Sequence, residues 1–162
     1  MLFASPDYWD DYSASELIER VTHSYQLCLQ SLHQSQLNNP EYPSIRNLVS
    51  AFRDIKNHVL FCGFQHISPL LQGIDDIIDE LENQSIQLTP NLADLINLSI
   101  QLVVLRLKMK ITAPQNNAYD LQLANICEHL TKVITAKEHQ LDERIKDAVK
   151  LLLKTQFLPA SV

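Results

Sequence analysis

The sequence contains very little glycine, with two glycines against seven prolines in 162 residues. Tight β-hairpin turns depend on glycine, so this scarcity argues against a sheet of short strands. The stretches between the prolines are rich in leucine, isoleucine, glutamine, aspartate and lysine, which favours helices joined by short loops. Because 46% of the residues are hydrophobic, the chain can bury one core. We predict an all-α protein with a single domain over residues 1–162.

The sequence also lacks a basic patch, a membrane-spanning run and a basic N-terminal leader. The formal net charge is −6, and no cluster of Lys and Arg is interleaved with aromatic residues, so we expect no nucleic-acid partner. The densest apolar run, Leu98 to Leu107, is too short to span a bilayer and is followed by Lys108 and Lys110. The N-terminal MLFASPDYWDDYS carries three acids and no base. We therefore expect a cytoplasmic protein with no membrane contact.

Cysteine and histidine are present but form no motif that carries chemistry. Cys28, Cys62 and Cys127 are odd in number, far apart and set among apolar residues, which is typical of buried free thiols. The six histidines belong to no HExxH motif, no CxxC motif and no Ser/His/Asp arrangement. We therefore expect no metal site and no cofactor.

Apolar residues at helical spacing predict four helices in the first two thirds of the chain. The helices run from about Ser15 to Gln36, from Ile45 to Gly63, from Ile67 to Leu81, and from Pro90 to Leu107 with Thr89 as the N-cap. We expect them to form an antiparallel four-helix bundle over about residues 13–111. The third helix should pack on Phe52, Ile55 and Val59 through its regularly spaced apolar residues, which are Ile67, Leu70, Ile74, Ile77, Ile78 and Leu81.

The remaining apolar pattern predicts an additional long C-terminal helix over about residues 118–155. Apolar residues of the helix before it lie on more than one face, so this additional helix should cover one side of that helix. The heptad pattern is interrupted at Lys137 and Glu138. Two arrangements remain open for the apolar residues beyond the interruption: either they pack on a second copy in a homodimer, or the chain folds back after a break near Lys137. These residues are Leu141, Ile145, Val149 and Leu152.

Residues 51–64 read Ala-Phe-Arg-Asp-Ile-Lys-Asn-His-Val-Leu-Phe-Cys-Gly-Phe. This stretch resembles the core motif of histidine-containing phosphotransfer domains, the phosphorelay modules of chemotaxis-type and hybrid sensor kinases. That family has a phospho-accepting histidine, two residues, Lys-Gly, and then a Gly-Phe turn seven residues after the lysine. Lys56 matches the lysine, and Gly63-Phe64 matches the turn. The resemblance continues without a gap through the acidic and apolar positions of residues 68–81, and in element order it covers about Ser13 to Lys110.

The chain departs from this family at the reactive positions. Arg53 stands where the family has its phospho-accepting histidine, and Asn57 stands where it has the glycine after the lysine. A guanidinium stays protonated at physiological pH and has no free lone pair, so Arg53 cannot accept a phosphoryl group. Asn57 would partly fill the space that glycine leaves open for the approaching phosphoryl group. The pattern indicates a fold that was kept and a chemistry that was lost, so we expect no enzyme activity.

The resemblance also assigns neighbours to Arg53. The family's acid on the third helix orients the phospho-histidine, and Asp75 matches that acid. Arg53 and Asp75 should face each other, so that Asp75 accepts a charge-assisted hydrogen bond from Arg53 while Lys56 and Gln72 flank the pair. The same pair could equally be an ordinary surface ion pair. The predicted partner-binding face consists of Arg53, Lys56, Asn57, Gln72 and Asp75.

The resemblance implies a non-catalytic phosphotransfer-like module of two-component or chemotaxis-type signalling that binds a receiver domain, a kinase domain or another signalling partner. Two alternatives stay open. One is an active phosphocarrier that uses His58, which lies about 140° around an ideal helix from Arg53 and so on a different face. The other is a helical scaffold or oligomerisation domain unrelated to phosphorelay, which shares only the pattern of a helical bundle with the family. Whether the chain is a fragment of a kinase or a complete protein is also open.

Overall fold

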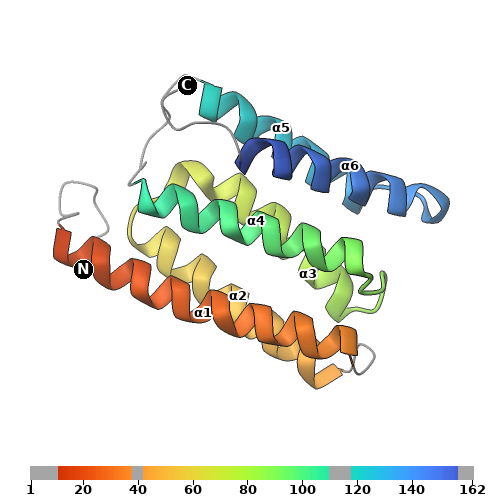
Figure 1. The fold of residues 1–162 in the computed structure, drawn as a ribbon, viewed down its shortest axis with the longest axis horizontal. Coiled ribbons are helices and arrows are strands. Elements are labelled where there is room, and N and C mark those ends of the chain that lie inside the picture. Colours follow the sequence, from red (N-terminus) through yellow and green to blue (C-terminus); the bar gives the residue numbers. More distant parts are fainter. Residues whose placement is uncertain (1–10, 38–41, 110–117, 157–162) are drawn as a thin grey trace.

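The computed structural model describes residues 11–37, 42–109 and 118–156, and within these ranges the chain is all-helical. They contain six α-helices and no strand (Figure 1), which confirms the all-α prediction. The helices are α1 (Asp11–Leu37), α2 (Tyr42–Phe61), α3 (Ser68–Glu82), α4 (Pro90–Lys108), α5 (Ala118–Ile134) and α6 (Glu138–Gln156). None of them is long and apolar enough to cross a membrane.

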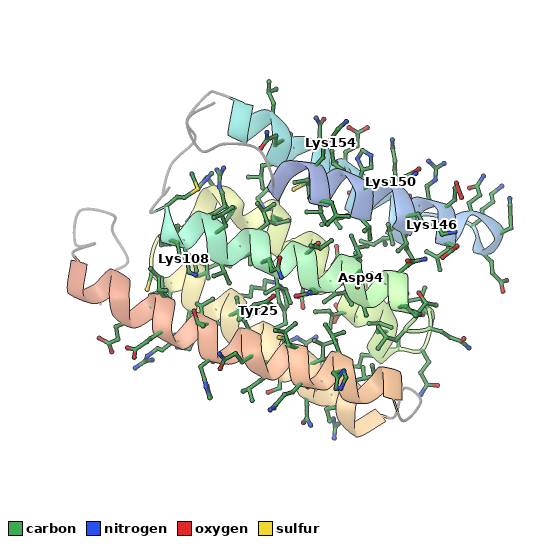
Figure 2. All side chains as sticks on the ribbon, viewed as in Figure 1. Tyr25, Asp94, Lys108, Lys146, Lys150 and Lys154 are labelled. Atoms are coloured by element: carbon green, nitrogen blue, oxygen red, sulfur yellow. The ribbon has the colours of Figure 1, made fainter. Side chains whose placement is uncertain are left out.

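The helices stack as three pairs. Figure 1 shows α1 and α2 on one side, α3 and α4 in the middle and α5 and α6 on the other side, with each helix running back along the one before it. Helix α1 contacts α2 and α4, and α3 also contacts α2 and α4, so these four helices form a closed ring of neighbours. Tyr25 of α1 points toward α4 (Figure 2), where its hydroxyl donates a 2.6 Å hydrogen bond to Oδ1 of Asn97. The α5–α6 pair covers α3 and α4 from outside the ring.

The apolar face predicted for α3 is fully buried. Phe52, Ile55 and Val59 of α2 have no exposed surface, and no predicted α3 residue is more than 4% exposed. The predicted set comprises Ile67, Leu70, Ile74, Ile77, Ile78 and Leu81, of which Ile67 lies in the 3₁₀ segment just before α3 and the others lie on α3. Since α2 and α3 are in contact, the predicted burial of this face is confirmed.

Helix α4 is buried on two sides, as its apolar pattern predicted. It begins where expected, because Thr89 Oγ1 accepts a 3.2 Å hydrogen bond from the Leu92 N–H and Pro90 follows as the first helical residue. Helices α1 and α3 contact α4 on one side, and α6 contacts it on another. The covering helix is therefore α6, the last helix in the described residues.

The prediction of one additional C-terminal helix over 118–155 is wrong, because the structure has two helices there. Helix α5 ends at Ile134 and α6 begins at Glu138, so the break falls at the predicted interruption. An unbroken helix of ~35 residues would extend ~50 Å and leave its distal apolar residues in solvent. Instead, Ile145 and Leu152 are buried at 2% and 0% exposure, and Leu141 and Val149 are partly buried. The fold-back arrangement is thus the one that the chain adopts.

The turn between α2 and α3 depends on Gly63, whose φ of 97° lies in the left-handed region that favours glycine. The Gly63 N–H donates to Leu60 O, and the Phe64 N–H donates to Val59 O. Phe64 is completely buried and leads into a short 3₁₀ segment, Gln65–Ile67. The Gly-Phe pair therefore ends α2, anchors the turn in the core and sets the direction of α3.

Helix α3 meets α5 closely at Gly73. A Cβ added there would lie 3.0 Å from Cδ1 and 3.4 Å from Cβ of Leu130. We predict that Gly73→Leu destabilises the fold by ~1–3 kcal/mol, because the new side chain must displace α5, even though leucine is a better helix former than glycine. Urea unfolding followed by circular dichroism measures the change. Adding Leu130→Ala to Gly73→Leu should recover part of the loss, and no recovery would contradict the contact as its cause.

The three cysteines are free thiols, as predicted, but only Cys28 is fully buried. Burial raises the pKa of Cys28 to about 12, and it also raises the pKa of Cys62 and of Cys127. At pH 8, iodoacetamide should therefore label Cys28 only after unfolding, while the half-buried Cys62 and Cys127 react slowly in the native protein. Mass spectrometry of the labelled peptides tests this order.

The raised pKa of Cys28 also affects the stability of the fold at high pH. A thiol whose pKa is raised in the folded state leaves stability intact below its unfolded pKa. Above that value the unfolded thiol ionises first, so Cys28 should reduce stability as the pH rises from ~8.5 toward about 12. The Cys28→Ala variant should lose less stability over this range, and an equal loss would contradict the role of Cys28.

Candidate functional site on helices α2 and α3

The predicted face forms at the seam between α2 and α3. Arg53, Lys56 and Asn57 are three and four residues apart on α2, which places them on one side of that helix. Gln72 and Asp75 are similarly spaced on α3. Lys56 joins the two helices, since its Nζ donates a 2.9 Å hydrogen bond to Asp75 Oδ2 and a 3.2 Å hydrogen bond to Gln72 Oε1.

Asp75 is the buried acid of this face, with its side chain 11% exposed. The expected hydrogen bond from Arg53 to Asp75 is absent, because Arg53 Nε lies 3.8 Å from Asp75 Oδ1 in an ion pair only. Asp75 Oδ1 is buried and accepts no hydrogen bond. Lys56, not Arg53, is therefore the hydrogen-bond partner of this carboxylate.

Arg53 instead bonds further along α3. Its Nη2 donates a 2.7 Å hydrogen bond to Asp79 Oδ1 and lies 3.8 Å from Glu82 Oε1. The reason is the antiparallel pairing of the helices: a residue one turn earlier on α2 faces a residue one turn later on α3. Asp79 and Glu82 were missed at the sequence level, although the spacing of Asp75, Asp79 and Glu82 along one side of α3 was a usable signal.

Arg53 thus stands among three carboxylates and is 47% exposed. An exposed ion pair contributes only ~0.2–1 kcal/mol, so these contacts fix the position of the guanidinium more than they stabilise the fold. Half of the Arg53 side chain remains available to a partner. Asn57 is exposed beside it.

His58 lies on the other side of α2, facing α1, as its position on the helix predicted. Its Nδ1 is 2.8 Å from the backbone oxygen of Asp54, and its Nε2 is 3.3 Å from Nη1 of Arg20. A carbonyl can only accept, so Nδ1 carries the proton and Nε2 accepts from Arg20. The Asp54 carboxylate accepts a 2.6 Å hydrogen bond from the Ser24 hydroxyl. This cluster does not share a contact with Lys56 or Asp75.

An open hollow of about 910 Å³ between α1 and α2 reaches the edge of the predicted face. Arg53 and Asn57 are among the residues that line it, together with several small polar side chains. These are Ser24, Ser31, Asn47 and Ser50. Sequence patterning did not reveal the hollow, because it depends on how two helices sit side by side.

No group of three or more His, Cys, Asp or Glu side chains in the described part of the chain could hold a metal ion. What the face presents is one half-exposed guanidinium, one exposed amide and a lysine–carboxylate pair. Such groups can recognise a partner, and neither the guanidinium nor the amide is a nucleophile. Comparison with protein-family models, with curated proteins and with solved structures found no match.

Proposed function

We propose that the chain is a non-catalytic phosphotransfer-like module, which binds a receiver domain or kinase domain of a signalling system without carrying phosphate. The observation that carries the proposal is that Arg53, which the resemblance aligns with the acceptor histidine, is held by Asp79 beside the Lys56–Asp75 pair. The Arg53 side chain is half-exposed, and its hydrogen bond to Asp79 fixes the position of the guanidinium. A receiver that docks against a phosphotransfer histidine would meet a guanidinium here.

The scaffold around this position supports the proposal. Helices α1 to α4 form a closed ring of neighbours, which is compatible with the four-helix bundle that the resemblance implies, and Gly63-Phe64 makes the turn between α2 and α3. In the resemblance, the matched residues Lys56, Gly63 and Phe64 are retained. The parts that perform the chemistry are replaced by Arg53 and Asn57.

The choice of variants follows from the contacts of Arg53. Arg53→Glu would add a carboxylate beside Asp75, Asp79 and Glu82, so a loss of binding could reflect repulsion within the protein. Arg53→Gln removes the charge and keeps a polar side chain, although a shorter one. Lys132→Gln on α5 is the matched control, since it removes one cation from an exposed ion pair away from this face.

The experiment is a pull-down of purified receiver and kinase domains from the source of the chain, with the native protein, Arg53→Gln and Lys132→Gln as bait. We expect at least one domain to bind the native protein and Lys132→Gln equally, and Arg53→Gln about 10-fold more weakly. If no receiver or kinase domain binds, the signalling proposal fails and a helical scaffold is favoured. Binding that is unaffected by Arg53→Gln would place the partner surface elsewhere.

A second candidate function is a phosphocarrier that uses His58, and one observation favours it. The bond from Nδ1 to the Asp54 carbonyl places the lone pair on Nε2, which would have to release its contact with Arg20 before it could attack. Incubation with a phosphorylated receiver distinguishes the candidates. Acid-labile, base-stable phosphate that is lost in His58→Gln would establish the carrier and overturn the non-catalytic proposal.

A further inference from the structure

A second hollow, of about 610 Å³, lies at the end of the molecule where the α3–α4 connection meets the α5–α6 turn. Both connections lie at the same end in Figure 1. The hollow is on the α5 side of α3, whereas Arg53 contacts Asp79 and Glu82 on the α2 side. It is therefore separate from the partner-binding face and goes beyond the function proposed above.

The floor of this hollow is apolar and belongs to the core. Ile77, Val133 and Ile145 line it and are each 1% or 2% exposed, so they are held firmly by the surrounding helices. Ile86, Ile134 and Leu141 also line it and are only partly buried, and Ala136 adds a small apolar side chain. An apolar side chain placed here would lose contact with water and pack against fixed walls.

The charged side chains at the rim of the hollow are all acidic. Glu80, Glu138 and Asp142 line the hollow, and no Lys, Arg or His lines it. Asp142 already has a cation, since its Oδ2 is 3.1 Å from Nζ of Lys146, which extends from α6 (Figure 2). Within the described residues, the Glu80 and Glu138 side chains have no such partner. Two uncompensated carboxylates therefore flank an apolar floor.

We propose that this hollow binds a basic segment of a partner protein in which an apolar side chain lies between two Lys or Arg residues. The apolar side chain fills the floor, and the two cations face Glu80 and Glu138. A small monovalent cation would compensate only one of these carboxylates, so a segment with two cations complements the rim better. An acidic or neutral segment would leave both carboxylates without a partner and would be disfavoured.

The test uses three fluorescent peptides with the central sequences Lys-Leu-Lys, Lys-Ser-Lys and Glu-Leu-Glu, titrated with the full chain. Fluorescence anisotropy gives each Kd, and methyl NMR shifts of Ile86 and Leu141 against Leu27 on α1 locate the binding. We expect Lys-Leu-Lys to bind at least ~10-fold more tightly than the other two, with shifts at Ile86 and Leu141 only.

Variants separate this site from general attraction to an acidic protein. Glu80→Gln with Glu138→Gln should weaken Lys-Leu-Lys binding about 10-fold, whereas the matched pair Glu16→Gln with Glu19→Gln on α1 should change it less than about twofold. Gln87→Lys adds a cation at the exposed rim and should also weaken binding. This single variant tests the site even if the double variant does not fold.

Equal effects of the two double variants, equal binding of the three peptides, or shifts centred on α1 would each overturn the proposal. Arg53→Gln should leave the peptide affinity unchanged. Arg53→Gln therefore tests the receiver-binding face, whereas the Glu80 and Glu138 variants test this hollow.

Discussion

Arg53→His combined with Asn57→Gly is expected to take phosphate from a phosphorylated receiver that the native chain binds, while the native chain takes none. The imidazole would stand beside Asp75 Oδ1, which accepts no hydrogen bond and can therefore orient a ring N–H. Lys56, 2.9 Å from Asp75 Oδ2, would supply positive charge for the arriving phosphoryl group. Radiolabelled phosphate on the purified variant, stable in base and labile in acid, measures the gain.

The single variant Arg53→His is the control for the role of Asn57. It should be labelled less than the double variant, because the exposed Asn57 side chain still crowds the approach. The glycine substitution should also cost up to ~1 kcal/mol of helix stability, which thermal unfolding would show. Equal labelling of the single and double variants would refute the blocking role of Asn57, and labelling of neither would refute Arg53 as the acceptor position.

Ile74→Ala is expected to destabilise the fold by ~2–5 kcal/mol. Ile74 is 1% exposed on the face of α3 that packs in the core, so the truncation leaves a cavity that rigid neighbours cannot fill. Since domains of this size are commonly stable by only ~5–15 kcal/mol, the loss should be visible as a large shift of the urea midpoint.

Leu121→Ala is the matched control, because Leu121 is 71% exposed on α5. Removing its side chain creates no cavity and should change stability by less than ~0.5 kcal/mol. If Ile74→Ala costs as little as Leu121→Ala, the core assigned to α3 is not where the stability of the protein resides.

The positions of α1 to α4 and of the buried α3 face could be predicted from the sequence, because both depend on local spacing. Apolar residues three and four apart select a helix and one of its faces before any partner helix is known. The turn at Gly63 was also predictable, since a left-handed backbone conformation favours glycine wherever it occurs. The break before Glu138 was indicated by the loss of the heptad pattern.

The contacts across helices could not be predicted in the same way. That Arg53 bonds to Asp79 and Lys56 to Asp75 depends on the offset between two antiparallel helices, which local spacing does not contain. The return of α6 onto α4 was one of two arrangements open to the same apolar residues, and only the assembled core selects between them.

The sequence by itself determined where α1 to α4 lie, which of their faces are apolar and that Arg53 has no nucleophile to offer, because these are properties of single side chains and their local order. The tertiary structure alone decided that the α5–α6 pair closes over α3 and α4, and that Glu80 and Glu138 flank one hollow. These juxtapositions join residues far apart in the chain, and their distances are set by side-chain packing between helices.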